Sequence, residues 1–141
     1  MYKILILCTG NSCRSQMAHS WLESFLQHKA IIFSAGTKPE KVNTYAVKVM
    51  LEKNIDISKN TSNHVSEYDD INFDFVITVC DNARELCPVF PNTKRVIHHS
   101  FIDPAEATGE EHIVLEIYRK VRDELKLFLI DFCNQQGLKR V

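Results

Sequence analysis

The residues with the clearest chemistry in this sequence are Cys8 and Arg14, which stand six positions apart. An apolar run at residues 4–7 comes directly before the cysteine, and five mostly small residues separate it from the arginine. Backbone N–H groups in such a loop, and at the helix N-terminus that follows, bind oxyanions and lower the pKa of a thiol. We therefore predict that Cys8 is a thiolate nucleophile at the floor of an oxyanion site.

Arg14 and the loop before it supply the predicted binding groups. An arginine offers a planar fork of donors that fits a tetrahedral oxyanion, and the hydroxyl of Ser15 can donate a hydrogen bond to the Cys8 thiolate. Gly10 permits a turn with positive φ, and Asn11 tolerates that region better than most residues. The predicted oxyanion-binding residues are Thr9, Gly10, Asn11, Ser12, Cys13 and Arg14, with Cys13 expected to act mainly as a small packing residue.

The spacing of Cys8 and Arg14 is weak evidence by itself, because a buried cysteine at a strand end beside a loop-capping arginine has the same pattern. The surrounding elements make it more specific. Apolar runs and helical periodicity predict strands at 4–7, 30–36, 73–79 and 94–99, and helices at 14–28, 43–53, 81–86 and 110–133. Asn43 or Thr44 is the expected N-cap of the second helix. In the last helix, the inward residues are expected to be Ile113, Ile117, Val121, Leu125, Phe128, Leu129 and Phe132.

Alternating strands and helices predict an α/β domain with a parallel sheet and right-handed crossovers. In such sheets, ligands bind beyond the carboxyl ends of the strands. Cys8 and Cys80 each end a strand, and the loop 102–104 follows the fourth one. We therefore expect these three places to share one edge of the sheet.

Composition limits the function classes. The chain has 141 residues with 45% hydrophobic and 25% charged residues, which suits one globular domain. A net charge of −1 argues against nucleic acid as a partner. No apolar segment is long enough for a signal peptide or a membrane span, so we expect a cytoplasmic protein that does not bind membranes.

The five cysteines are odd in number and are not spaced as paired metal-binding knuckles, so we expect catalytic or redox use for some of them. Cys133 falls on the apolar side of the last helix and is expected in the core. His98 and His99 lack the usual spacing of zinc ligands, so we expect no metal site. We also expect a monomer.

The segment 8–15 resembles the phosphate-binding loop of the low-molecular-weight tyrosine phosphatase fold, and most of all its thioredoxin-coupled arsenate reductase branch. The likeness continues through residues 34–37, 79–80, 87–88 and 103–105. It implies a single domain over residues 1–141, built on a four-stranded parallel sheet with helices on both faces. It also implies roles in catalysis for Cys8 as nucleophile, Arg14 as oxyanion ligand and Asp103 as general acid.

The resemblance implies a further role for Cys80 and Cys87 in arsenate reduction and arsenical resistance. Cys8 would attack arsenate while Asp103 protonates the departing oxygen, and Cys80 would then attack Cys8 and release arsenite. Cys87 would next form a Cys80–Cys87 disulfide that thioredoxin reduces, with no bound cofactor. A continuous helix over 80–87 would place these Cα atoms roughly 10 Å apart, whereas a disulfide tolerates about 7 Å, so we predict a redox-dependent change of shape.

Two other functions remain open from the sequence. The first is a phosphatase that uses Cys8, Arg14 and Asp103, since the loop does not distinguish phosphate from arsenate by shape. The second is a non-catalytic, redox-sensing module that binds oxyanions.

The sequence departs from the family pattern at three positions. His19 stands where many of these reductases have an acidic residue associated with a bound potassium ion, and Asn63 stands where a second acidic ligand is expected. Because Asn11 and Ser34 remain, a potassium site is doubtful rather than excluded. His99 replaces a frequent tryptophan before the acid loop, which is expected to alter how that loop affects the pKa of Cys8.

Overall fold

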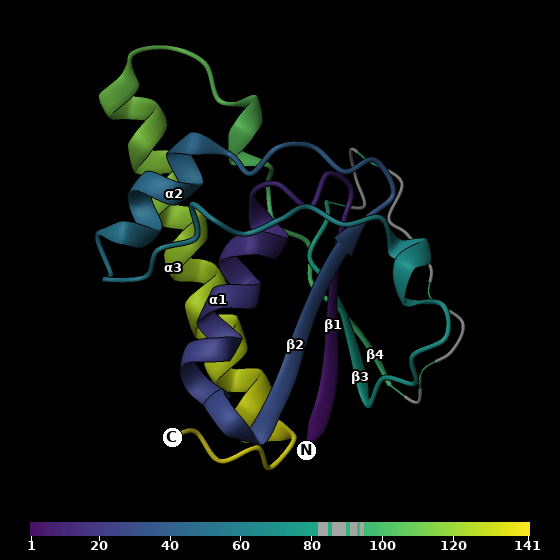
Figure 1. The fold of residues 1–141 in the computed structure, drawn as a ribbon. Helices are drawn as coiled ribbons and strands as arrows, with labels where there is room; N and C mark the ends of the chain where they lie inside the picture. Colours follow the sequence, from purple (N-terminus) through teal and green to yellow (C-terminus); the bar gives the residue numbers. More distant parts are fainter. Residues whose placement is uncertain (82–84, 86–89, 91–92, 94) are drawn as a thin grey trace.

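The structure is a computed structural model of residues 1–141, and it describes all of them except 82–84, 86–89, 91–92 and 94. Its described part contains a parallel sheet with the strand order β2-β1-β3-β4 (Figure 1). The strands are β1 (Tyr2–Cys8), β2 (Ala30–Gly36), β3 (Phe75–Thr78) and β4 (Val96–His98). The predicted α/β domain with a four-stranded parallel sheet is therefore confirmed.

Strand β1 lies at the centre of the sheet and fixes the position of Cys8. It pairs with β2 along its whole length, from Tyr2 opposite Ala30 to Cys8 opposite Gly36, and with β3 on its other side. Its residues 4–7 are all 0% exposed, because helices or loops cover both faces of the sheet. The nucleophile candidate therefore stands at the carboxyl end of a strand whose last five residues are buried.

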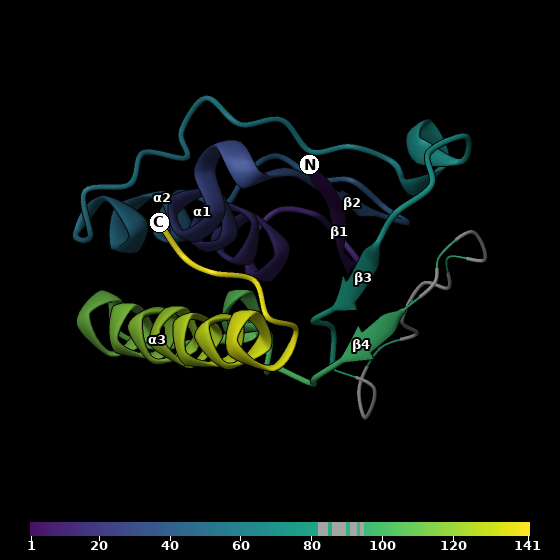
Figure 2. The same ribbon diagram turned by 90° about the horizontal axis from the view of Figure 1, so that it is seen from below.

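Three α-helices cover one face of the sheet: α1 (Arg14–Leu26), α2 (Thr44–Leu51) and α3 (Glu111–Gln135). Figure 2 shows all three on the same side, where they share the larger hydrophobic core with β1 and β3. On the opposite face, a short 3-10 helix, η2 (Val65–Tyr68), and its flanking loop cover a smaller core. Helical segments therefore flank both faces, as the resemblance implied, although the cover on the second face is slight. Two more 3-10 helices are η1 (Gln27–Lys29) and η3 (Pro104–Glu106).

The ends of the elements follow local signals. Asn43 is the N-cap of α2, and its Oδ1 accepts hydrogen bonds from the N–H groups of Tyr45 and Ala46. The first helix ends at Leu26, two residues earlier than expected, where Gln27 adopts a positive φ of 42°. The short helix predicted at 81–86 lies mostly outside the described residues.

The inward face of α3 differs from the prediction at its first two turns. Ile113 is 50% exposed, whereas Val114 and Tyr118 are buried. The ring of Tyr118 packs against Tyr45 of α2 and its hydroxyl accepts a hydrogen bond from Asn43. The contact with α2 therefore sets the rotation of α3 there, and the apolar pattern of the sequence does not show it. From Val121 onward the predicted face is broadly right, and Cys133 is in the core.

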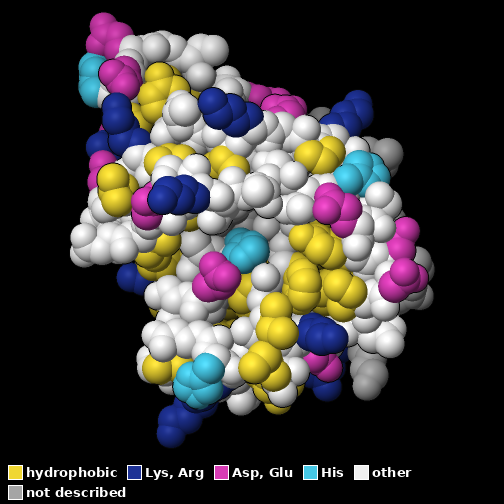
Figure 3. Space-filling view, viewed as in Figure 1, with side chains coloured by type: hydrophobic (Ala, Val, Ile, Leu, Met, Phe, Trp, Pro, Cys, Tyr) yellow, Lys and Arg dark blue, Asp and Glu magenta, His cyan; other side chains and the backbone are white. Residues whose placement is uncertain are grey.

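The surface is mixed in charge. On the face shown in Figure 3, acidic and basic side chains are interspersed, and Lys and Arg do not gather in one patch. Among the helices of the described residues, none combines the length and the apolar character that a membrane crossing needs.

Candidate active site

The candidate site is built on the loop between β1 and α1. Cys8 is the last residue of β1 and Arg14 is the first residue of α1, so two rigid elements hold the two ends of a five-residue loop. Both side chains are 3% exposed. Together with Asp103 they line a cavity of about 200 Å³. The three residues predicted to act in catalysis therefore meet at one place.

The carbonyl groups of the loop are held on its outer side. The carbonyl oxygens of the loop accept from N–H groups of the following segment: Thr9 from Lys38 (3.0 Å), Gly10 from Glu40 (2.9 Å) and Ser12 from Asn43 (2.8 Å). Since each peptide is planar and trans, an outward carbonyl leaves the next N–H on the opposite side. Within the described residues, no backbone N–H of residues 10–12 donates a hydrogen bond. These N–H groups are therefore available to an oxyanion.

Asn11, not Gly10, adopts the left-handed backbone conformation of the loop. Its φ is 49°, whereas the described glycines with positive φ are Gly109 and Gly137, so of the two residues that the sequence offered for this turn, Asn11 is the one that adopts it. The Asn11 side chain fixes this turn, because Oδ1 accepts from the N–H of Asn63 at 2.9 Å and Nδ2 donates to Ser15 Oγ at 2.8 Å. Asparagine tolerates this backbone region better than most residues.

Ser15 is buried beneath the loop, and its hydroxyl oxygen accepts the hydrogen bond from Asn11. This contact leaves the hydroxyl hydrogen of Ser15 available. The predicted donation to Cys8 stays a prediction, since no hydrogen bond between Ser15 and Cys8 is present among the described residues.

Gly36 is a site residue that the sequence reasoning missed. It ends β2 opposite Cys8, and a Cβ atom placed on it would lie 2.3 Å from the carbonyl oxygen of Thr9 and 3.0 Å from the N atom of Asn11. Only a glycine permits this approach of two backbones. The available signal was a glycine at the end of the strand that follows the first helix.

Arg14 is held by acceptors from two later segments. Its Nη1 and Nη2 donate to the two carboxylate oxygens of Glu85 at 2.8 and 2.9 Å, and Nη1 also donates to the carbonyl of Phe101 at 3.1 Å. Burial lowers the pKa of Arg14, but the hydrogen bond with Glu85 and the nearby charges of Cys8 and Asp103 raise it overall. In the described part of the chain, Nε of Arg14 is buried without a hydrogen-bond partner, so one donor remains for an oxyanion.

Asp103 reaches the cavity from the loop after β4. It is the N-cap of η3, where its Oδ1 accepts from the N–H of Ala105 at 3.0 Å. Its Oδ2 lies 3.6 Å from Nη2 of Arg14, and its side chain is 27% exposed. One carboxyl oxygen of Asp103 is thus held by the backbone, while the other lies beside the cavity, where a general acid is needed.

Cys13 is buried in the loop, and burial first of all raises its pKa well above the usual range. The charges of Asp103 and Cys8 raise it further. A thiol of this kind stays protonated, which agrees with the expected packing role.

Cys80 lies at the same sheet edge as Cys8. The preceding residue, Val79, donates its N–H to the carbonyl of Leu7 at 3.0 Å, next to Cys8 in the central strand. Cys80 is fully buried and disulfide-bonded, whereas Cys8, Cys13 and Cys133 are free thiols. Cys87 lies outside the described residues.

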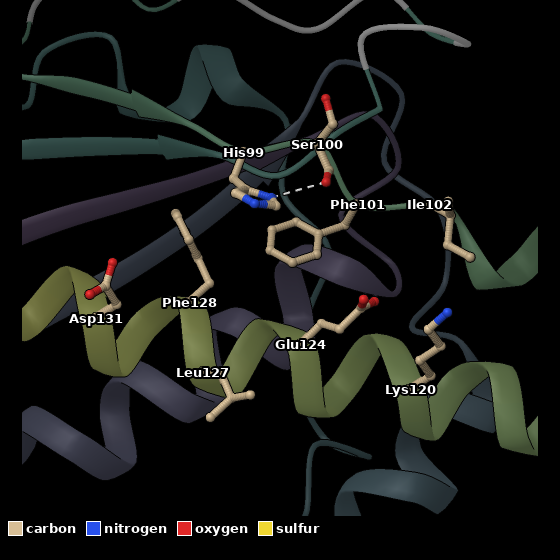
Figure 4. Close-up of a pocket in the computed structure, with 9 residues that line it drawn as sticks. All are labelled: His99, Ser100, Phe101, Ile102, Lys120, Glu124, Leu127, Phe128 and Asp131. Atoms are coloured by element: carbon tan, nitrogen blue, oxygen red, sulfur yellow. Dashed lines mark hydrogen bonds between the residues drawn. The ribbon is translucent and has the colours of Figure 1, made fainter.

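Two of the residues that differ from the family pattern, His19 and His99, have defined contacts. His19 Nδ1 lies 2.8 Å from Ser34 Oγ and its Nε2 lies 3.3 Å from Glu23. Within the described residues, no group of three or more His, Cys, Asp and Glu side chains is placed to hold a metal ion. The ring of His99 packs at a tilt against Phe101 and Phe128 in a pocket between the loop after β4 and α3 (Figure 4). An aromatic contact therefore occupies this position without a tryptophan.

A free cysteine below a loop of outward carbonyls, with a buried arginine and a carboxyl group beside it, defines an oxyanion-binding thiol site on an α/β sheet. The model of the low molecular weight phosphotyrosine protein phosphatase family matches residues 3–139. The chain therefore belongs to this family.

Known relatives include both reductases and phosphatases. An arsenate reductase from Halalkalibacterium halodurans is 43% identical over 122 residues, which cover 86% of this chain and 88% of that protein. A solved structure of an arsenate reductase in the phosphate binding state is 28% identical, with a TM-score of 0.81 and coverage of 96% and 98%. The arginine phosphatase YwlE from Geobacillus stearothermophilus is 25% identical, with a TM-score of 0.75 and coverage of 97% and 94%.

Proposed function

We propose that this chain reduces arsenate to arsenite and that thioredoxin regenerates it. The observation that carries the proposal is the meeting of Cys8, Arg14 and Asp103 in one cavity, with Cys80 at the same sheet edge. The similarity to arsenate reductases over most of the chain favours this reaction.

The proposed reaction begins with attack of the Cys8 thiolate on arsenic(V). A sulfur–arsenic bond forms, and the departing oxygen leaves as water with a proton from Asp103. The N–H groups of the loop and Nε of Arg14 stabilise the negative charge on the remaining oxygens.

The electrons come from the thiols. The Cys80 thiolate attacks the Cys8 sulfur, so that a disulfide forms, two electrons pass to arsenic and arsenite leaves. Cys87 then attacks Cys80, which frees Cys8 and leaves a Cys80–Cys87 disulfide for reduction by the dithiol of thioredoxin. A free thiol at Cys8, with a disulfide-bonded Cys80 at the same sheet edge, is the pattern expected at the end of this cycle.

A phosphatase is the second candidate, and the similarity to an arginine phosphatase favours it. The same cavity would bind a phosphoryl group, with Cys8 as nucleophile and Asp103 as acid, and Cys80 and Cys87 would have no part in the reaction. A non-catalytic oxyanion sensor is the third candidate, and for it the Asp103→Asn change would leave function unaffected.

One pair of assays separates the candidates. Arsenate-dependent oxidation of NADPH is followed with thioredoxin and thioredoxin reductase, and hydrolysis of an aryl phosphate is followed in parallel. We expect Cys8→Ser to abolish both activities, and Cys87→Ser to abolish arsenate turnover while aryl phosphate hydrolysis continues. Cys133→Ala, which removes a core thiol away from the cavity, is the control. Arsenate turnover that survives Cys87→Ser would refute the three-cysteine reaction.

We further propose a cytoplasmic location, because reduction by thioredoxin needs a reducing compartment. For the chain in solution we propose a monomer, without nucleic acid or membrane partners. Potassium dependence is proposed to be weak, since the side chain of His19 is hydrogen-bonded to Ser34 where the family pattern has an acidic residue.

A further inference from the structure

The carboxylate of Glu85 forms an ion pair with Arg14, the arginine of the oxyanion site. Its two oxygens accept from Nη1 and Nη2 of Arg14 at 2.8 and 2.9 Å, and Oε1 also accepts from the hydroxyl of Thr9 at 2.7 Å. Thr9 is the first residue of the oxyanion loop, and the Glu85 side chain is only 18% exposed. A planar anion of this chain thus holds two donors of Arg14 in a fork-to-fork arrangement.

This carboxylate adds charge to a cavity that is already acidic. Glu40, Asp103 and Glu106 also line the cavity, whereas Arg14 is the basic side chain among its lining residues. Glu85 pairs with the positive charge of Arg14, which an incoming oxyanion would use. Burial raises the pKa of Glu85, but the hydrogen bonds from Arg14 and Thr9 outweigh this effect and lower the pKa overall. A dianion beside this carboxylate would meet uncompensated like charge.

We propose that Glu85 is an internal competitor of the oxyanion in the disulfide form of the protein. In this form, the carboxylate weakens the binding of arsenate, phosphate and similar anions at Arg14. The protein then does not hold a new substrate until a reductant has reopened the disulfide. The inference rests on the proposed function, because it assigns a regulation to the same site.

The link to the redox state comes from the position of Glu85 in the chain. Its N–H donates to the carbonyl of Asp81 at 2.9 Å, and Asp81 directly follows the disulfide-bonded Cys80. This hydrogen bond therefore ties the backbone of Glu85 to the residue that follows the disulfide-bonded cysteine. A continuous helix over 80–87 would hold its ends roughly 10 Å apart, beyond the reach of a disulfide of about 7 Å. In the proposed reaction the Cys80–Cys87 disulfide spans residue 85, so its reduction would permit a different backbone path there.

The test measures phosphate binding rather than turnover. Inorganic phosphate is titrated by calorimetry into the disulfide form and into the fully reduced form of the whole protein. In the disulfide form, we expect Glu85→Gln to tighten phosphate binding by about tenfold or more, because the like charge is gone. In the reduced form, we expect a change of about threefold or less. Glu85→Ala, which removes the side chain without leaving an amide on Arg14, should behave in the same way.

Glu106→Gln is the matched control. It removes one carboxylate from the same cavity, but Glu106 has no ion pair with Arg14 among the described residues. We expect it to change phosphate affinity by about threefold or less in both forms.

Three results would overturn the inference. The first is unchanged phosphate affinity of the Glu85 variants in the disulfide form, and the second is an equal gain in both redox forms. The third is weaker phosphate binding by the Glu85 variants than by the wild type in the disulfide form, which would make Glu85 a positioning residue for Arg14. None of these results depends on arsenate turnover, so a wild-type protein that fails to reduce arsenate refutes the proposed function separately.

Discussion

The closest backbone contact at the site predicts a large effect of Gly36→Ala. The new Cβ would lie 2.3 Å from the carbonyl oxygen and 2.8 Å from the carbonyl carbon of Thr9. A normal carbon–oxygen contact is about 1 Å longer than the first distance, so strand β2 or the loop must move by that amount. Because both partners are backbone in a packed sheet, the free energy of unfolding should fall by about 3 kcal/mol. A displacement of the loop by about 1 Å should also lower arsenate turnover by about 100-fold.

Urea unfolding and the coupled NADPH assay measure these two effects for Gly36→Ala. Gly10→Ala is the control for stability, since the atoms nearest to its Cβ would be Ser12 Oγ at 3.3 Å and the carboxyl group of Glu40 at 3.7 Å. Rotation of the Ser12 hydroxyl relieves that contact, and we expect a loss of about 1 kcal/mol or less. The reasoning is wrong if Gly36→Ala unfolds at the same urea concentration as the wild type and turns over arsenate at the wild-type rate.

Two other changes test the support of the site. Asn43→Ala removes the N-cap of α2 and the hydrogen bond to Tyr118, so urea unfolding should show a loss of about 1 kcal/mol, and an unchanged midpoint would contradict this account. The hydrogen bond from Arg119 first, and that from Arg122 next, lower the pKa of Glu52 from 4.5 to about 2. A depressed carboxyl pKa stabilises the fold above pH ~4.5 and loses that effect as pH falls toward ~2. Because Glu52 is 37% exposed, the effect is screened, and Glu52→Gln should remove about 1 kcal/mol of the acid-dependent change. Unfolding curves with equal pH dependence in both proteins would refute it.

Features that depend on short stretches of chain were predictable from the sequence. The apolar run before Cys8 and the periodicity after Arg14 place the loop between a strand and a helix, and the structure agrees within two residues at the helix end. Asn43 could be named as a possible cap because the reason for it lies within three residues. Even within the loop, however, local reasoning offered both Gly10 and Asn11 for the positive φ that Asn11 adopts. Both residues tolerate that region, and the tertiary contact of Asn11 with Asn63 decides between them.

Features that depend on distant segments were not predictable in this way. The sequence shows a glycine at the end of a strand at Gly36, but it does not indicate that the backbone of Thr9 passes against it. The exposed position of Ile113 follows from the packing of Tyr118 against α2, which sequence periodicity does not contain. The carboxylate of Glu85 is 71 positions from Arg14 in the chain, and a charged residue between two cysteines resembles any solvent-exposed one.

Different segments therefore serve oxyanion binding and the proposed reaction that follows it. The loop around Cys8 supplies N–H groups and Arg14 for any tetrahedral oxyanion, so it fits a phosphatase and a reductase equally well. The segment that begins at Cys80 supplies the second thiol of the proposed reaction, and its Glu85 carboxylate reaches back to Arg14. In these two proposals, one short segment thus carries both the redox chemistry and a charge that opposes oxyanion binding. A phosphatase would gain nothing from such a carboxylate, whereas a reductase that waits for thioredoxin would be kept free of bound oxyanion while it is oxidised.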